Sequence, residues 1–319
     1  MRIGVDLMGG DTPPIDLFEG VLHSLEALNS EVEFIFFADA LSIDSIRSRF
    51  DKDLSKSKRL RFFQAQEIIF MADAPLQAVR SKPLSSLVLG VQSLKKDEID
   101  AFISCGNTGA LVAASTLFLQ KFPGIRRPAL LALLPAKLGP VALIDVGGHV
   151  SFKAEHLVQF ARMGASFQQV YRNISCPSIG ILNIGTEPTK GTSELQKTWD
   201  FLDTHKSGKM RFVGNIEPAH LLDGEVDVLV TDGFTGNIIL KTAEGVSAYI
   251  LGSLSEEDRK SHPISQVEYP GAFICGVDGL VIKCHGNATA KALGRSVEAA
   301  VLFLKRDLIE KLKKSVVEE

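Results

Sequence analysis

Two polar side chains in glycine-rich stretches have the chemistry of an anion site: Lys190 in NIGTEPTKG and Asn237 in TDGFTGN. A lysine ammonium can neutralise a phosphate or a developing oxyanion, and an asparagine amide supplies neutral N–H donors. The stretch from Val226 to Gly245 predicts a buried strand, a tight glycine loop and a helix, a junction that directs N–H groups at one point. Asparagine at a helix start is as often only a cap, so both interpretations of Asn237 stay open.

Four further stretches place glycine after an expected strand: MGGD, GNTG, DVGGH and KCHG. One such loop indicates only turn chemistry, but in open α/β sheets ligands collect outside the carboxyl ends of the strands. The six loops together therefore predict a site for a phosphate and a polarised carbonyl. The candidate phosphate- and substrate-binding residues are Gly106, Asn107, Thr108, Gly109, Asp232, Gly233, Thr235, Gly236 and His285.

Other residues of these loops have a structural role as the favoured interpretation. Asp6, Gly9, Gly10 and Asp11 are expected to shape the first loop. Asp6 and Asp232 end strands, where a carboxylate orients neighbouring loops through backbone hydrogen bonds. For His285, donation of a hydrogen bond or proton and a core role bonded to backbone are equally open.

These loops are positioned by an alternation of apolar runs and amphipathic segments, which implies a largely parallel sheet covered on both faces. The expected strands are Arg2–Asp6, Val32–Ala38, Leu60–Ala65, Asp100–Cys105, Ala129–Leu134, Val141–Val146, Ser178–Ile184, Met210–Val213, Val226–Val230 and Leu280–Cys284. The expected helices are Pro83–Lys96, Ala110–Gln120, Lys153–Tyr171, Ser193–His205, one from Ile238 and one carrying Leu293 to Leu312. Residues 135–140 are too few for a helical crossover, so the strands on either side are expected to form an antiparallel hairpin. The polar Ser253–Pro270 stretch indicates a surface connection.

Composition limits the class of protein. The 319 residues carry a net charge of −3, which argues against a nucleic-acid-binding surface. Four cysteines stand singly, so neither a metal site nor a disulfide framework is indicated. No signal peptide and no apolar run of about 18 residues is found, which predicts a cytoplasmic protein with peripheral membrane contact left open. A single α/β catalytic unit over 1–319 is expected, with two lobes, about 1–100 plus 275–319 and 101–274, as the alternative.

The dinucleotide fingerprint, the P-loop, H-E-x-x-H and the G-x-S-x-G elbow are all missing, so no cofactor is expected. Direct attack by bound phosphate on an acyl group needs only positioning and charge stabilisation, and the loops supply both.

A series of motifs resembles the PlsX-type phosphate acyltransferases of bacterial phospholipid synthesis over nearly the whole chain. The motifs are VDLMGGD, SCGNTGALVA, GIRRPAL, LLP, LIDVGG, KAEHLVQFARMG, ILNIGTEPTKG, VDVLVTDGFTGN and GLVIKCHG. The resemblance implies a three-layer α/β/α fold with a mostly parallel mixed sheet and two lobes around a cleft, like isocitrate and isopropylmalate dehydrogenases and phosphotransacetylases. It also implies transfer of a long fatty acyl chain from acyl carrier protein to inorganic phosphate, with Lys190 and Asn237 as the catalytic pair.

The resemblance further implies a homodimer and a downstream glycerol-3-phosphate acyltransferase. The segment Leu254–Pro270 is shorter than in the family, where a longer apolar segment is associated with membrane contact, so at most peripheral contact at the inner membrane is expected. Arg126, Arg127, Lys121 and Lys137 are a candidate docking cluster for the acidic carrier protein, with an ordinary solvated face as the alternative.

Two rival functions remain. A small-acid dehydrogenase of the same fold would need clustered arginines for the substrate carboxylates and several aspartates for a divalent metal. A non-catalytic phosphate or nucleotide sensor would keep the loops without the chemistry. Retention of both Lys190 and Asn237 argues against the sensor.

Overall fold

The computed structural model describes residues 1–25, 28, 32–261 and 271–317. The chain divides into two compact units, unit 1 with Met1–Lys121 and Tyr269–Ile309, and unit 2 with Phe122–Glu268 and Glu310–Glu319. The expected single catalytic unit and its two-lobe alternative stay predictions. Each unit is described by itself.

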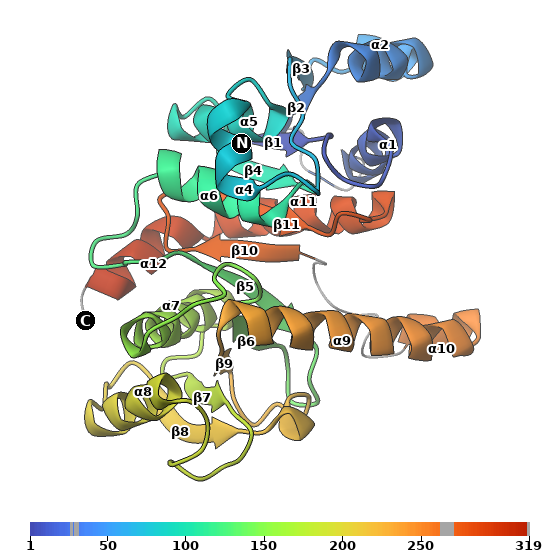
Figure 1. Ribbon diagram of the computed structural model, residues 1–319. Helices are drawn as coiled ribbons and strands as arrows, with labels where there is room; N and C mark the ends of the chain where they lie inside the picture. The colour runs from blue at the N-terminus through green and yellow to red at the C-terminus, as the bar shows by residue number, and fades with distance from the viewer. Residues whose placement is uncertain (26–27, 29–31, 262–270, 318–319) are drawn as a thin grey trace. The chain divides into compact units, whose positions relative to one another are not determined.

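Unit 1 contains a six-stranded sheet in the order β3-β2-β1-β4-β11-β10 (Figure 1). Its strands are β1 (Arg2–Asp6), β2 (Glu33–Ala38), β3 (Leu60–Gln64), β4 (Ala101–Ser104), β10 (Gly271–Cys275) and β11 (Leu280–Cys284). The neighbours pair in parallel except β10 and β11, which are antiparallel. The helices are α1 (Pro14–Leu25), α2 (Ala40–Arg49), α3 (Asp51–Lys56), α4 (Pro75–Ser81), α5 (Ser86–Lys95), α6 (Thr108–Phe118) and α11 (Ala290–Lys305).

Unit 2 contains strands in the order β5-β6-β9-β7-β8. They are β5 (Ala129–Leu134), β6 (Val141–Ile144), β7 (Ser178–Leu182), β8 (Arg211–Ile216) and β9 (Val228–Val230). The β5–β6 pair is antiparallel, which confirms the expected hairpin, and the other pairs are parallel. The helical segments are α7 (Ala154–Arg172), α8 (Ser193–Thr204), the 3₁₀ turn η1 (Pro218–His220), α9 (Gly233–Ser253), α10 (Glu256–Ser261) and α12 (Leu308–Val317), of which residues up to Ile309 belong to unit 1.

These pairings confirm the expected α/β class with a mostly parallel mixed sheet. Central strands such as β4, β6 and β9 are buried along their whole length, which explains why they are continuous apolar runs in the sequence. In unit 1, α5 packs on β1, β2 and β4, while α11 packs on β4, β11 and α1. In unit 2, α7 packs on β6, β7 and β9.

Two sequence expectations are wrong in detail. Helix α9 begins at Gly233 and runs to Ser253, so the helix starts before Ile238 and occupies part of the expected glycine loop. The single helix expected at the end of the chain is divided into α11 and α12, because Asp307 between them adopts a φ of 52°. The expected surface connection from Ser253 is exposed over residues 255–258 and contains the short helix α10, while its residues 262–270 lie outside the described part of the chain.

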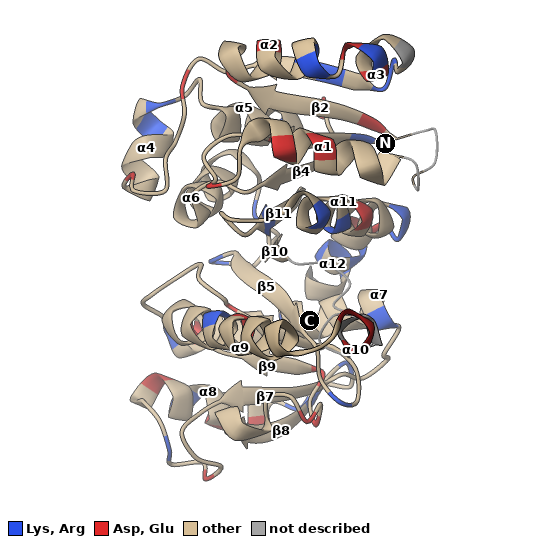
Figure 2. Cartoon of the chain, turned by 90° about the vertical axis from the view of Figure 1, so that its right-hand side faces the viewer, with Lys and Arg blue, Asp and Glu red and all other residues tan. Residues whose placement is uncertain are grey.

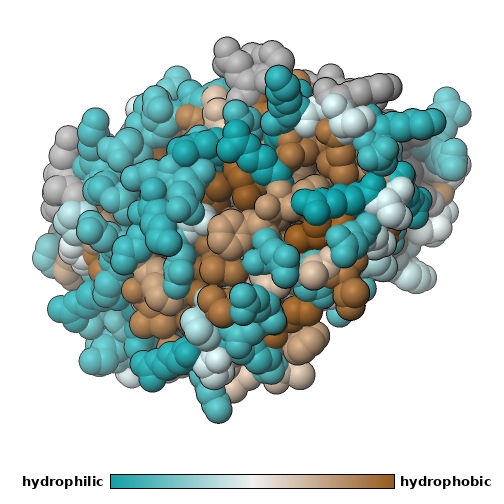
Figure 3. Space-filling model, turned by 90° about the horizontal axis from the view of Figure 1, so that it is seen from above, coloured by the Kyte–Doolittle hydropathy of each residue, from teal (hydrophilic) through white to brown (hydrophobic). Residues whose placement is uncertain are grey.

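The free edge of the unit 1 sheet is strand β3, whose Arg61 and Gln64 are exposed. Arg61 forms an ion pair with Glu33 of β2, with 3.4 Å between Nη2 and Oε2. Charged and polar side chains on an edge strand disfavour pairing with another chain. Exposed apolar side chains, brown in Figure 3, occur among hydrophilic ones, and Leu41 and Phe63 of unit 1 are 81% and 40% exposed.

No helix within the described residues combines the length and the apolar character that a membrane span requires.

The core of unit 1 is built on phenylalanines, and Phe36 of β2 lies at its centre. Phe36 is 0% exposed, and its ring centroid is 4.8 Å from that of Phe18 and 5.6 Å from that of Phe62. We expect Phe36→Ala to lower the free energy of unfolding by about 3–5 kcal/mol, because it leaves a cavity among these rings. Urea unfolding followed by circular dichroism would measure the loss. The control Leu41→Ala, at an exposed position of α2, should change it by less than about 0.5 kcal/mol; equal effects would contradict this account of the core.

Candidate active site

In unit 2, three neighbouring parallel strands end together. The register aligns Ile144 of β6 with Val230 of β9, and Val230 with Ile181 of β7. The connections that begin at Asp145, Thr231 and Asn183 therefore leave the sheet at one edge. These connections carry DVGGH, TDGFTGN and NIGTEPTKG, so Lys190 and Asn237 both follow strands that end at this edge.

The connection after β6 is folded around the carboxylate of Asp145, which is 0% exposed. Its Oδ1 accepts hydrogen bonds from the N–H groups of Gly147 at 3.3 Å and Gly148 at 2.7 Å. Its Oδ2 accepts one from the His149 N–H at 3.0 Å. Successive N–H groups aimed at one oxygen pair compensate a buried negative charge.

The start of α9 is capped by Asp232. Its Oδ1 accepts from the N–H groups of Phe234 and Thr235, both at 3.0 Å, and its Oδ2 accepts from the Thr235 hydroxyl at 2.7 Å. The Gly233 N–H donates to the His149 carbonyl at 2.9 Å. The N–H groups expected to bind phosphate are thus already used within the protein, and Asn237 is not the cap. The phosphate contacts predicted for Asp232, Gly233, Thr235 and Gly236 stay predictions.

Glycine is required at two positions of α9 because the helix lies directly against the Asp145 connection. An ideal Cβ on Gly236 would lie 2.0 Å from the Asp145 carbonyl oxygen, and one on Gly233 would lie 2.6 Å from the His149 nitrogen. The sequence analysis took these glycines as loop residues that let a backbone approach phosphate. In the structure they let a helix approach a loop.

The side chain of Asn237 is exposed on the second turn of α9. An ideal Cβ on Gly147 would lie 3.7 Å from its Cβ, Cγ and Oδ1, so Asn237 adjoins the connection that Asp145 folds. Within the described part of the chain, no hydrogen bond of its amide group is found. The amide is therefore open to a ligand.

Lys190 is exposed in the connection between β7 and α8. Its Nζ has neither a hydrogen bond nor an ion pair with any described residue. The backbone around it is fixed, since the Lys190 N–H donates to the Glu187 carbonyl at 3.1 Å and Asn183 Nδ2 donates to the Lys190 carbonyl at 3.1 Å. The structure thus presents an unpaired ammonium on an ordered loop.

Unit 1 repeats this arrangement with β1, β4 and β11. The register aligns Asp6 with Ser104, and Ser104 with Lys283. The loops that follow meet: the Asp11 N–H donates to the Gly286 carbonyl at 2.7 Å, and an ideal Cβ on Gly9 would lie 3.5 Å from the Gly106 Cα. Three of the six loops are therefore brought together in unit 1.

Five residues of unit 1 were expected to bind substrate, and the structure shows the position of each. Asn107 caps α6 by accepting from the Ala110 N–H at 3.0 Å, and its Nδ2 donates to the carbonyls of Phe70, Met71 and Asp73 at 3.1–3.2 Å. Its side chain is thus engaged in holding the 70–73 segment. Thr108 and Gly109 form the first turn of α6, Gly106 is buried, and His285 is half-buried after β11. Binding of substrate by these residues remains a prediction.

Asp6 accepts hydrogen bonds from the Met8 N–H at 3.0 Å and the Ser104 hydroxyl at 2.7 Å. These are contacts of a loop-orienting carboxylate. Burial raises the pKa of Asp6 from 3.8 to about 6, because desolvation outweighs the hydrogen bonds of Ser86, Ser104 and Met8 and the charge of Lys283. Lys283 is itself buried, and its Nζ donates to the carbonyls of Cys105 and Cys284.

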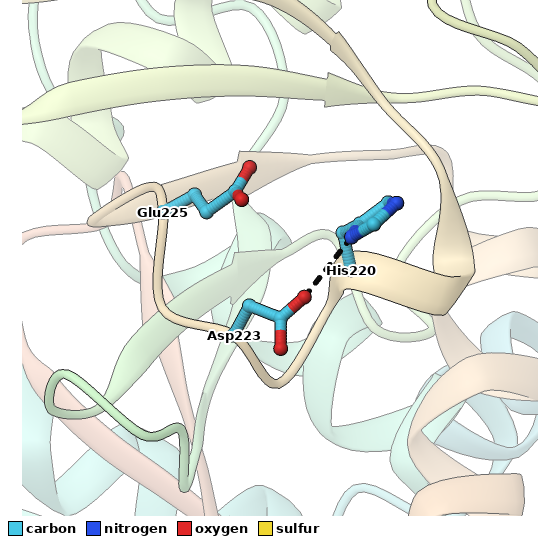
Figure 4. A group of neighbouring side chains, drawn as sticks. All are labelled: His220, Asp223 and Glu225. Atoms are coloured by element: carbon cyan, nitrogen blue, oxygen red, sulfur yellow. Dashed lines mark hydrogen bonds and ion pairs between the residues drawn. The ribbon is translucent and has the colours of Figure 1, made fainter.

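One group of described residues could offer three metal ligands: His220, Asp223 and Glu225 of unit 2, whose ligand atoms lie within 4.8 Å of one another (Figure 4). His220 Nδ1 lies 3.0 Å from Asp223 Oδ2, and the Lys137 ammonium lies 2.6 Å from Asp223 Oδ1. The hydrogen bond to Asp223 raises the pKa of His220, which favours the imidazolium over a metal-binding imidazole. The three side chains form a cluster at the surface of unit 2 in which Asp223 pairs with both His220 and Lys137.

The suggested basic docking cluster is partly neutralised. Arg126 forms an ion pair with Glu155, Lys137 pairs with Asp223, and Arg127 Nη1 donates to the Ser151 carbonyl at 2.7 Å. Lys121 belongs to unit 1 and the others to unit 2. Figure 2 shows basic and acidic residues distributed over both units, in agreement with the net charge of −3.

The sequence analysis missed the roles of Asp145, Asn183 and Asn215. A signal existed for the first, because Asp145 follows an apolar run as Asp6 and Asp232 do. No local signal existed for Asn215, which lies in β8 and whose Nδ2 donates at 2.8 Å to the carbonyl of Glu187, 28 positions away. Asn183 was assigned only to a strand, although it lies seven positions before Lys190, to whose carbonyl it donates.

Solved structures define the class of fold. A branched-chain phosphotransacylase from Enterococcus faecalis aligns with a TM-score of 0.63 over 97% of this chain and 99% of that chain, at 13% identity. A phosphotransacetylase from Streptococcus pyogenes aligns with a TM-score of 0.61 over 100% and 94%, at 16% identity. The fold is that of the phosphotransacylases.

Sequence relatives give the family. Residues 1–268 match the model of a family described as fatty acid synthesis protein. Phosphate acyltransferases of Chlamydia pneumoniae and Chlamydia caviae are 39% and 40% identical, with 99% of both chains covered in each case. That of Thermoanaerobacter pseudethanolicus is 36% identical over 99% of this chain and 97% of its own. The chain belongs to the phosphate acyltransferase family, which confirms the resemblance found in the sequence.

The buried carboxyl of Asp6 should make stability depend on pH. Between an unfolded pKa near 3.8 and a folded pKa of about 6, the folded protein keeps a proton that the unfolded chain releases. The free energy of unfolding should therefore fall by about 2 kcal/mol as the pH rises from 4 to 6, and level off above about pH 7. Asp6→Asn should remove this part of the slope in urea unfolding at pH 4, 5, 6 and 7. Parallel curves for the two proteins would contradict the assignment.

Two glycines of α9 allow a matched test of its contact with the Asp145 connection. Gly236→Ala places a Cβ against backbone and should cost about 3 kcal/mol or more. At Gly245 an added Cβ meets nothing within 4 Å, so Gly245→Ala should stabilise the protein by about 0.5–1 kcal/mol. Urea unfolding of both variants measures the difference, and the same sign for both would rule out the close approach.

Proposed function

We propose that this protein transfers a long-chain fatty acyl group from acyl carrier protein to inorganic phosphate and so forms an acyl phosphate for phospholipid synthesis. Membership of the phosphate acyltransferase family supports the acyl transfer. The observation that carries the site is the common edge of β6, β9 and β7, where Lys190 and Asn237 follow neighbouring strands with an unpaired ammonium and an unpaired amide.

In the proposed reaction an oxygen of hydrogen phosphate attacks the thioester carbonyl carbon. A C–O bond forms, the C–S bond breaks, and the released thiolate takes the proton that the phosphate loses. Negative charge develops first on the carbonyl oxygen. The Lys190 ammonium would neutralise the phosphate or this oxyanion, and the Asn237 amide would donate a hydrogen bond to the carbonyl.

The proposal includes a homodimer, a glycerol-3-phosphate acyltransferase that consumes the acyl phosphate, and at most peripheral contact of a cytoplasmic enzyme with the inner membrane. These extensions rest on the resemblance of the sequence motifs to the PlsX-type family. The sensor alternative has no specific support. The dehydrogenase alternative would need several carboxylates for a divalent metal. Among the described residues the one such group is His220, Asp223 and Glu225, and its Asp223 is already paired with Lys137.

The reaction can be tested with acyl-acyl carrier protein and phosphate, by trapping acyl phosphate as the hydroxamate. We expect product only when phosphate is present. Lys190→Ala and Asn237→Ala should each lower kcat by about 100-fold or more, the loss typical of one oxyanion donor, with unchanged thermal unfolding. Lys197→Ala is the control, because Lys197 is an exposed lysine of α8 paired with Glu194 at 2.7 Å.

Phosphate binding without product would favour the sensor. Product from a fully active, folded Lys190→Ala variant would remove Lys190 from the mechanism and leave the overall reaction standing.

A further inference from the structure

Two buried asparagines of the sheet donate hydrogen bonds to the loop that carries Lys190. Asn183, directly after β7, and Asn215, in β8, are each 5% exposed. By contrast, Thr186 to Lys190 are all exposed. Exposed loops have little packing to fix their backbone, so the order of this loop has to come from its hydrogen bonds to the sheet.

Those hydrogen bonds converge on a short turn. Asn215 Nδ2 donates to the Glu187 carbonyl at 2.8 Å, and the Lys190 N–H donates to the same carbonyl at 3.1 Å. Asn183 Nδ2 donates to the Lys190 carbonyl at 3.1 Å. The N–H and C=O of Lys190 are therefore both fixed, one through Glu187 to β8 and the other directly to the end of β7.

The side chain of Lys190 lies over Gly185. An ideal Cβ on Gly185 would lie 2.9 Å from Glu187 Oε2, and 3.0 Å from Cγ and 3.2 Å from Cε of Lys190. The side chains of Glu187 and Lys190 thus occupy the space that a side chain at 185 would fill. Glycine at 185 allows the Lys190 stem to take this course over the loop.

Asn215 is poorly suited to a purely structural role. Its Oδ1 is buried and has no hydrogen-bond partner in the described structure. A half-satisfied buried amide stabilises a strand less than an apolar side chain of similar size would. The interaction that its amide does make, with the Lys190 loop, accounts for its presence.

We propose that Asn183, Asn215 and Gly185 are positioning residues that hold the Lys190 ammonium in place for the acyl transfer. This inference rests on the proposed function of Lys190. The asparagines set the backbone of the turn, and Gly185 sets the direction of the side chain. A lysine that is already ordered loses less conformational freedom when it meets the reacting phosphate.

Two variants remove the two kinds of support. Asn215→Asp keeps the size of the side chain but as a carboxylate has no N–H to donate to the Glu187 carbonyl, and Gly185→Ala keeps every hydrogen bond but displaces the side chains of Lys190 and Glu187. We expect each to lower kcat for acyl phosphate formation by about 10-fold or more. The control Gly208→Ala, where an added Cβ meets nothing within 4 Å, should leave kcat unchanged.

A double-mutant cycle separates positioning from a general loss of structure. If the supports act through Lys190, adding Gly185→Ala or Asn215→Asp to Lys190→Ala should not lower the residual rate further. Further independent losses of 10-fold would overturn the proposal, as would a fully active Gly185→Ala variant.

A second measurement does not depend on activity. After reductive methylation with ¹³C-formaldehyde, the dimethyl-lysine resonance of Lys190, identified by its loss in Lys190→Ala, should be resolved from those of other exposed lysines. It should move toward them in Asn215→Asp and Gly185→Ala. A Lys190 resonance that coincides with mobile surface lysines in the unsubstituted protein would overturn the positioning. Absence of acyl phosphate with a resolved resonance would instead reject the proposed reaction.

Discussion

The carboxylate of Asp145 determines the geometry of the candidate site in unit 2. A fully buried carboxylate is stable only where donors surround it, and here the donors are the N–H groups of Gly147, Gly148 and His149. The connection after β6 therefore curls tightly and turns backbone atoms toward α9. Glycines at 233 and 236 let the helix lie against that surface, and the place of Asn237 follows from this contact.

A second carboxylate stands at the equivalent point of unit 1 and is compensated differently. Asp6 also follows a parallel strand, but a hydroxyl, from Ser104, replaces some of the N–H donors. Its pKa is raised to about 6 because these bonds do not offset the loss of solvent. Similar positions at strand ends thus use backbone N–H donors in one unit and a mixture of hydroxyl and backbone donors in the other.

The strands could be predicted from sequence because burial on both faces of a sheet produces apolar runs, as in β5 and β11, which match their expected ranges. The hairpin of β5 and β6 followed from the length of its connection. Helix α9 was started too late because Gly233 and Gly236 indicate a loop by local propensity, while a tertiary contact requires them within a helix. The break at Asp307 was hidden because Leu304, Leu308 and Leu312 keep helical spacing across it.

The candidate site was predictable to the extent that its loops follow strands. Lys190 and Asn237 were identified by residue type and by motif, and the ends of β6, β9 and β7 do lie in register. The asparagines that hold the Lys190 loop were not predicted, because a hydrogen bond such as that from Asn215 to the Glu187 carbonyl joins residues 28 positions apart. Periodicity reports which face of a strand is buried and carries no information on such partners.

Helix α9 has its fully buried residues at its first turns, since Gly233 and Gly236 are the buried residues among its 21, while Tyr249 is 82% exposed. At about 1.5 Å per residue, Tyr249 lies about 24 Å from Gly233 along the axis and Asn237 only about 6 Å. A change of about 5° in the direction of the helix about its glycine end would therefore displace Tyr249 by about 2 Å but Asn237 by about 0.5 Å. The contact of Gly233 and Gly236 with the Asp145 connection thus places the Asn237 amide where a change in helix direction displaces it about four times less than the far end.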